Sequence, residues 1–130
     1  MLFGKIDEPI QPLVMTLNAC GFHTFASCSG HGFPVHRLLP YVAFRAPLFR
    51  VAALDRSLYH DSLSAIPVLN WGWFLTGSFN PNGELGFCLR PTRPYRRVDI
   101  YRRGSLQADF EVLGILLHGL ARQEPLNTSV

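Results

Sequence analysis

Long apolar runs are absent from this chain of 130 residues, even though 48% of its residues are apolar. The longest apolar stretch, residues 110–120, is interrupted by Glu111, Gly114 and His118. Because a membrane-spanning helix needs about 20 consecutive apolar residues, we expect no such helix and no membrane partner. The N-terminal sequence MLFGKIDEP lacks a basic segment followed by an apolar one, so we expect no secretory signal peptide.

Cysteine is scarce as well. The three cysteines, Cys20, Cys28 and Cys88, cannot all pair with one another, and their spacing shows no disulfide framework. This usage favours a reducing compartment, and we expect the protein in the cytoplasm. Charged residues make up only 16% of the chain, which argues against disorder and for a folded domain. We place this single domain at residues 1–124 and predict a flexible tail at residues 125–130.

Lysine is almost missing, since Lys5 is the only lysine among twelve basic residues, and the net charge is +3. Arginine forms bidentate contacts with phosphate and carboxylate groups and stacks on aromatic rings. The excess of arginine therefore favours an acidic or phosphate-bearing partner. A composition bias that replaces lysine by arginine throughout the chain would produce the same count.

Helical and strand periodicities alternate along the chain. Apolar residues at helical spacing predict three helices, at residues 9–18, 47–62 and 105–120. Apolar or alternating segments predict four strands, at residues 22–27, 41–44, 69–76 and 85–89. The dipeptide Asn82-Gly83 predicts a hairpin between the last two strands.

This element order indicates the α+β class. We predict a single domain with a mostly antiparallel sheet of about four strands and with the helices packed on one face. If the strand at residues 22–27 joins the sheet, the result is a ferredoxin-like sandwich with its strand order permuted. We expect Trp71, Trp73 and Phe74 to lie in the core, and residues 90–103 to form an irregular connection.

Chemically reactive side chains gather between Cys20 and His36. Cys28, His31 and His36 have the spacing C-x2-H-x4-H, and zinc accepts such ligands, with Cys20 or His23 as a fourth. A second hypothesis makes Cys28 a nucleophile with His31 as its base. Either hypothesis would make the protein an enzyme or a zinc protein.

The same turn is also a candidate anion site. Successive backbone N–H groups in a Gly- and Ser-rich turn form a concave nest, to which Ser27, Ser29 and His31 would add donors. Such a nest suits a phosphate or a carboxylate. The alternative is a tight connection between strands whose glycines are needed only for the shape of the backbone.

The second candidate site is the Arg-rich segment at residues 90–103. Positive charges interleaved with aromatic rings can follow a nucleic-acid backbone or grip an acidic protein surface. The alternative is a solvated connection between elements. The candidate binding residues of this segment are Arg90, Arg93, Tyr95, Arg96, Arg97, Tyr101, Arg102 and Arg103.

The motif G-F-x-T-x-x-S-C-x-G-H at residues 21–31 is followed by P-Y-V-x-F at residues 40–44. Together with W-G-W at residues 71–73 and L-R-P at residues 89–91, it resembles small uncharacterised proteins of bacterial mobile elements and phages. The resemblance and the small size imply a binding protein that docks on a host nucleic acid or nucleoprotein complex. An anti-CRISPR-like inhibitor of host defence is the concrete version of this expectation.

A shorter similarity implies a different function. Residues 27–30, Ser-Cys-Ser-Gly, are similar to a turn of the wybutosine-synthesis methyltransferase family, which modifies transfer RNA with S-adenosylmethionine. That family has arginine where this chain has His31. The similarity implies an RNA-modifying enzyme with S-adenosylmethionine as its cofactor, and this is the alternative to a binding protein.

Overall fold

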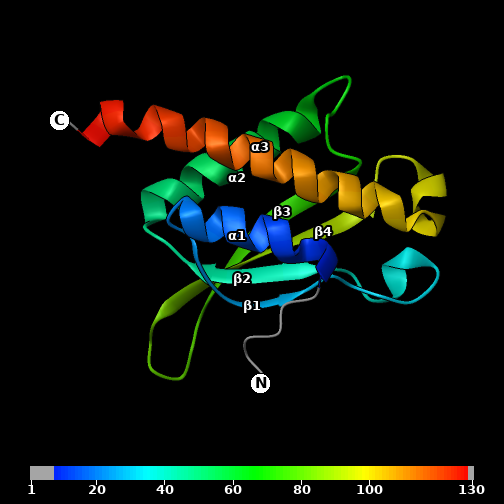
Figure 1. The fold of residues 1–130 in the computed structure, drawn as a ribbon, viewed down its shortest axis with the longest axis horizontal. Coiled ribbons are helices and arrows are strands. Elements are labelled where there is room, and N and C mark those ends of the chain that lie inside the picture. The colour runs from blue at the N-terminus through cyan, green and yellow to red at the C-terminus, as the bar shows by residue number, and fades with distance from the viewer. Residues whose placement is uncertain (1–7, 129–130) are drawn as a thin grey trace.

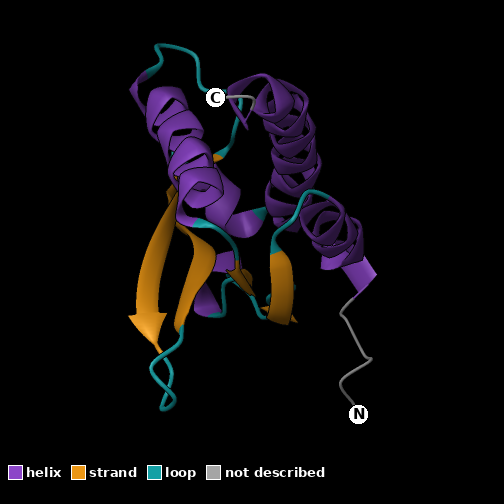
Figure 2. Cartoon of the chain, turned by 90° about the vertical axis from the view of Figure 1, so that its left-hand side faces the viewer, coloured by secondary structure: helices purple, strands orange, loops and turns teal. Residues whose placement is uncertain are grey.

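The fold has two layers, a sheet and a set of helices that covers one of its faces. The computed structural model describes residues 8–128 and, within them, the side chains of residues 9–122. The helices are α1 (Gln11–Ala19), α2 (Leu48–Leu63) and α3 (Arg103–Thr128). The strands are β1 (His23–Cys28), β2 (Tyr41–Arg45), β3 (Trp71–Phe79) and β4 (Leu85–Pro94). The predicted α+β class is confirmed, with the helices on one face of an open antiparallel sheet (Figures 1 and 2).

The strand order in the sheet is β1-β2-β4-β3, and each pair of neighbours is antiparallel. β4 lies between β2 and β3, which makes β2, α2 and β3 a split βαβ unit. If β1 were moved to the end of the chain, the order from β2 onwards would read βαββαβ, that of a ferredoxin-like sandwich. The strands therefore adopt the permuted ferredoxin-like arrangement expected from the sequence.

Alternating residues separate the two faces of the sheet. In β2, Val42 and Phe44 are fully buried beneath the helices, whereas Ala43 between them points to the opposite, uncovered face. Trp71 and Trp73 are also buried, as predicted. The prediction is wrong for Phe74, because this residue follows Trp73 in the strand and pairs with Arg90 on the opposite face. The core residues that the helices contribute are Leu13, Val14, Leu17, Val51, Leu54, Leu58, Leu106, Phe110, Leu113 and Leu117.

One sequence prediction is wrong in the middle of the chain. The expected irregular connection at residues 90–103 is strand for its first part, because β4 continues to Pro94. β4 pairs with β2 only from Phe87 to Leu89, so beyond Leu89 it pairs with β3 alone. Prolines are tolerated on such an edge because one row of its N–H groups needs no partner.

α3 begins two residues before the expected start. The Ser105 hydroxyl does not cap the helix from outside but lies in its first turn, where it accepts a hydrogen bond from Trp71 Nε1 at 2.8 Å and donates one to the Arg102 carbonyl at 2.7 Å.

α3 extends to Thr128, and residues 129–130 lie outside the described residues, so the flexible tail stays a prediction. Among the helices of residues 8–128, none is both long and apolar enough to cross a membrane.

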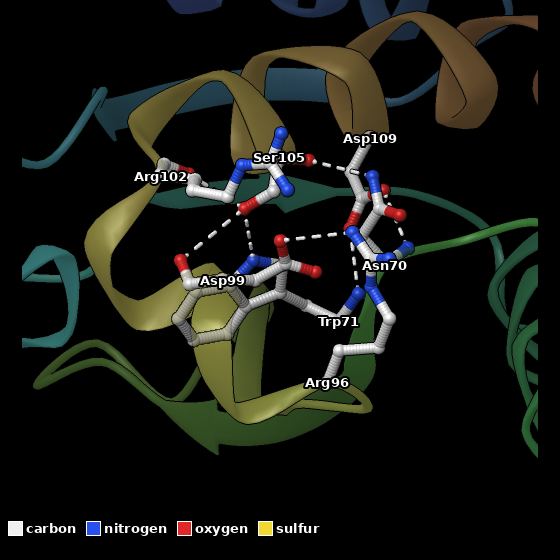
Figure 3. A network of polar contacts seen from close by, with 7 residues as sticks. All are labelled: Asn70, Trp71, Arg96, Asp99, Arg102, Ser105 and Asp109. Atoms are coloured by element: carbon white, nitrogen blue, oxygen red, sulfur yellow. Dashed lines mark hydrogen bonds and ion pairs between the residues drawn. The ribbon is translucent and has the colours of Figure 1, made fainter.

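A buried carboxylate joins α3 to the start of β3 (Figure 3). Asp109 is fully buried, and its Oδ1 accepts a hydrogen bond from the Asn70 N–H at 2.7 Å. Its Oδ2 accepts one from the Trp71 N–H at 2.9 Å and one from Trp73 Nε1 at 2.8 Å. Burial raises the pKa of Asp109 above its ordinary value of 3.8, and the three hydrogen bonds lower it by less.

We expect Asp109→Ala to destabilise the protein strongly, because it leaves buried N–H donors without an acceptor. Each donor that stays unpaired should cost about 1–3 kcal/mol in the free energy of unfolding. Urea denaturation measures this loss, with Glu111→Ala, an exposed position on the same helix, as the control. Equal midpoints for the two variants would contradict the structural role of Asp109.

The raised pKa of Asp109 predicts how stability changes with pH. The folded state keeps the Asp109 proton to a higher pH than the unfolded state does, so it binds more protons in the window above 3.8. The contribution of this group is therefore fully present below 3.8 and is lost as pH rises through the raised pKa. Denaturation curves across the acidic range should show a smaller decline with rising pH in Asp109→Asn than in the wild type.

Candidate nucleic-acid interface

The two segments singled out in the sequence meet in space. The loop after β1 packs against the 3-10 helix η3 (Arg97–Tyr101), and the rings of Phe33 and Tyr101 lie 5.7 Å apart. Arg103 Nη2 donates a hydrogen bond to the Gly32 carbonyl at 2.8 Å. Arg103, a predicted binding residue of the Arg-rich segment, therefore stabilises the loop after β1, which holds the other predicted site.

The turn at residues 27–32 uses its polar groups internally. The Ser29 side chain, in a residue that is 7% exposed, accepts a hydrogen bond from the Ile10 N–H at 3.1 Å. The Gly30 N–H donates to Cys28 Sγ at 3.4 Å, and the His31 N–H donates to the Leu38 carbonyl at 3.0 Å. These contacts favour a structural connection over an anion nest, because the N–H groups of Gly30 and His31, at the centre of the nest, already have partners.

The structure does not bring Cys28, His31 and His36 together as metal ligands. Among the described residues, no three His, Cys, Asp or Glu side chains form a group that could hold a metal ion. Cys28 ends β1, His31 forms an isolated bridge with Leu38, and His36 lies on the 3-10 helix η2 (Val35–Arg37). No hydrogen bond between the described side chains of Cys28 and His31 supports a nucleophile and base either.

The predicted Arg-rich binding segment is divided by the fold. Arg90 lies on the uncovered face of β4, whereas Arg96 forms an ion pair with Asp99 and Arg103 contacts the loop. The remaining candidates of this segment have exposed side chains, and they are Arg93, Tyr95, Arg97, Tyr101 and Arg102. The segment therefore does not form one continuous basic strip.

The uncovered face of the sheet has a floor of small side chains. Ala43 pairs with Cys88 across β2 and β4, and both point away from the helices. Gly86, two residues before Cys88, shares this face, and its backbone lies against the ring of Phe25. A groove of about 590 Å³ runs over this floor.

Aromatic rings stand around this floor. Phe25 lies in a β-bulge of β1, and Tyr41 precedes Ala43 by two residues in β2, so both line the groove. Phe74 pairs with Arg90 in the neighbouring strands and therefore shares its face. The Tyr95 hydroxyl lies close to Gly72 of β3 on the same side. We call Phe25, Tyr41, Phe74 and Tyr95 the aromatic platform.

The aromatic platform is accessible and carries positive charge at both ends. Phe25 is 54% exposed, Tyr41 36% and Tyr95 44%. Arg45 lies over the Phe25 ring, with its guanidinium carbon 4.8 Å from the ring centroid, and Arg90 lines the groove. Partial burial raises the pKa of the Tyr95 hydroxyl above 10.0, with smaller contributions from the Asp61 and Asp109 carboxylates. Tyr95 is therefore uncharged at neutral pH.

Sequence reasoning assigned Arg90 and Tyr95 to a binding site but missed Phe25, Tyr41 and Arg45. The signal for Tyr41 and Arg45 was present in the alternation of β2, because they flank the buried residues on the opposite face. The bulge at Phe25 has no comparable signal. It arises where the pairing of β1 with β2 shifts between Thr24 and Ala26.

A scan against protein-family models found no match, and searches of curated proteins and of solved structures found none either. The resemblances to mobile-element proteins and to the wybutosine-synthesis family therefore stay predictions. Any function has to be argued from the chemistry of the site, and that chemistry is aromatic and cationic.

Because the turn at residues 27–32 is tightly packed, we expect two glycine-to-alanine substitutions to lower the free energy of unfolding by different amounts. Gly30 has φ +81°, and a Cβ there would lie 2.6 Å from the Leu38 carbonyl oxygen. Gly83 has φ +79° but open space around it. Alanine in the left-handed region costs about 1–2 kcal/mol at either position, and Gly30→Ala should cost clearly more because the backbone must also move. Equal losses in denaturation experiments would mean that the turn is loosely packed.

Proposed function

We propose that this protein binds single-stranded nucleic acid across the uncovered face of its sheet. The observation that carries the proposal is the aromatic platform. Phe25 and Tyr41 line a groove that has small side chains on its floor and an arginine toward each end, and Phe74 and Tyr95 lie on the same face of the sheet. A protein that needed this face only for stability would cover it or make it polar. Contiguous exposed aromatic surface on a monomer instead marks a place where a partner binds.

The chemistry of the platform suits unpaired bases. Base–aromatic stacking contributes about 1–3 kcal/mol per base and tolerates any base, because every base has a π face. In a duplex these faces are hidden by the neighbouring base pairs, so the rings can engage only a strand whose bases are unstacked. The platform therefore favours a single strand over a double helix.

The small floor and the arginines complete the site. Ala43, Gly86 and Cys88 put no large side chain on the floor, so the rings stay in reach of a ligand, and the Phe25 ring packs between Gly86 and the Arg45 guanidinium. Arg45 and Arg90 would contact phosphates at the two ends of the groove. Arg45 also forms an ion pair with Glu84 at 3.6 Å, but both side chains are exposed, and such a pair contributes little.

This proposal keeps the partner class expected from the sequence, a phosphate-bearing macromolecule, and moves its main contact surface from the Arg-rich segment to the sheet. We further propose that the protein acts in the cytoplasm, as its cysteine usage favours. The strand could belong to a host nucleoprotein complex, which is the partner that the resemblance to mobile-element proteins implies. No contact of the Cys28–His31 turn favours the enzymatic alternative.

Removing a ring from the platform should weaken binding of a fluorescent twelve-nucleotide oligo(U), measured by anisotropy. We expect the Kd to rise about 5- to 150-fold in Phe25→Ala and in Tyr41→Ala, because each variant loses one stacking partner. Tyr59→Ala is the matched control, since Tyr59 is a 61% exposed aromatic residue on α2, away from the uncovered face.

The salt dependence of the same titration separates stacking from charge. Arg90→Ala should reduce the slope of log K against log salt by about 0.7, the value for one phosphate contact on a single strand. Arg56→Ala, an exposed arginine on α2, should leave the slope unchanged. The proposal fails if the wild type shows no saturable binding, or if the control variants lose as much affinity as the platform variants.

A further inference from the structure

A second cavity lies beside the aromatic platform, at the N-terminal end of α3. We propose that it is a nucleobase pocket that selects guanine, so that the strand on the platform is read at one position. This inference rests on the proposed function for its biological meaning, but it stands on separate contacts. The cavity measures about 310 Å³, which is at the small end of ligand cavities and is the size class of a single base. It is lined by Asn70, Arg96, Asp99, Arg102, Gly104, Ser105 and Ala108.

The decisive group is the carboxylate of Asp99. Its side chain is only 3% exposed, and Arg96 Nη2 lies 3.6 Å from its Oδ1 in an ion pair. Its Oδ2 is buried and accepts no hydrogen bond from any of the described residues (Figure 3). A buried carboxylate oxygen without a donor is costly, because it has lost water and gained nothing in return. Asp99 lines the cavity, and a ligand N–H that reaches its carboxylate would remove this cost. Because Oδ2 is fully buried, the side chains around it have to move for this contact to form.

A second acceptor lies in the same cavity. Asn70, which also lines the cavity, donates one of its two Nδ2 hydrogens to the Ser105 carbonyl at 3.1 Å, and its Oδ1 is a hydrogen-bond acceptor. Within the described residues, Asn70 Oδ1 accepts no hydrogen bond. Asp99 and Asn70 together therefore offer two accepting oxygens.

The donors of the cavity are two guanidinium groups. Arg96 is 67% exposed on its side chain and is held by the ion pair with Asp99. Arg102, also exposed, has no side-chain hydrogen bond to any described residue, although its carbonyl accepts from Ser105. Both guanidinium groups can donate to a base oxygen or nitrogen, or stack on the plane of a base.

Two acceptors beside two cationic donors match one base better than the others. Guanine carries two neighbouring donors, N1–H and the N2 amino group, next to the O6 acceptor, and O6 and N7 are the atoms that arginine prefers. Adenine and cytosine each have one amino group, and uracil has a single N–H between two acceptors. The two N–H bonds of an adenine or cytosine amino group diverge from one nitrogen, whereas guanine presents N1–H and N2–H side by side with O6 next to them. Guanine therefore matches two acceptors and an arginine on one side of the cavity best.

One backbone hydrogen bond links the aromatic platform to the wall of the cavity. The Tyr95 N–H donates to the Asn70 carbonyl at 2.9 Å, so the last ring of the platform is tied to a residue that lines the cavity. The Tyr95 hydroxyl reaches back over Gly72 of β3. The proposal therefore places the next base of a strand that stacks on Tyr95 at this end of the sheet, in the cavity that Asn70 and Asp99 line.

The test uses the four nucleoside 5′-monophosphates and the full chain. Titrations followed by amide NMR should give a Kd for GMP that is about tenfold or more below those for AMP, CMP and UMP. The amides of Asn70, Asp99 and Gly104 should shift, and those of the uncovered face should not. Asp99→Asn should abolish the preference for GMP, and Asp55→Asn, at an exposed position on α2, should keep it.

Arg102→Ala tests the pocket independently if Asp99→Asn does not fold, because the exposed Arg102 side chain can be removed without loss of packing. It should reduce the preference for GMP while the NMR spectrum stays that of a folded protein. Equal binding of all four nucleotides by the wild type overturns the pocket. So does a preference for GMP that survives in both folded variants.

Oligo(U) binding distinguishes this inference from the proposed function. Asp99→Asn should leave the affinity for oligo(U) unchanged, because uracil bases use the platform and not the cavity. If the wild type binds oligo(U) but shows no preference for GMP, the pocket is overturned and the platform stands. If it prefers GMP but does not bind oligo(U), the platform is overturned and the pocket stands.

Discussion

The hydrogen bonds to the buried Asp109 carboxylate are the contact on which the rest of the structure depends. One rigid group on α3 accepts from two consecutive N–H groups at the start of β3 and from the indole of Trp73. Because all three donors are fixed in space, α3 can lie over the sheet in one register only. That register also brings Ser105 to the indole of Trp71 and sets the position of η3 and of Asp99.

Because the helices α1, α2 and α3 all lie on one face of the sheet, the two faces of the sheet differ in chemistry. The covered face of the sheet is a continuous apolar core, while the uncovered face keeps rings, small side chains and arginines in reach of solvent. At this end of the sheet, the Tyr95 hydroxyl lies on the uncovered face, and the Tyr95 N–H donates to the carbonyl of Asn70, which lines the cavity at the start of α3. The same tertiary arrangement therefore makes a general stacking surface and places a polar pocket beside it.

Much of the fold could be predicted because local periodicity carries it. The helical spacing of Leu13, Val14 and Leu17 and the hairpin signal at Asn82-Gly83 each describe contacts between near neighbours. The candidate site was predicted less well, since its parts come from different strands. Arg90 and Tyr95 were found by composition, but the strand that carries Arg90 was predicted to end at residue 89, because prolines follow it. Asp109 could have been noticed as a carboxylate on the apolar stripe of the last helix.

The sequence by itself determined the α+β class, the order of the elements and the identity of the core, because burying alternating and helical apolar stripes has few solutions. Only the tertiary structure decided which polar groups have hydrogen-bond partners within the chain and which have none. In the packed structure the N–H groups of Gly30 and His31 have partners within the chain, and the Oδ2 of Asp99 has no donor among the described residues. The physical reason is that hydrogen bonds between distant residues depend on how whole elements pack, and no local pattern records that packing.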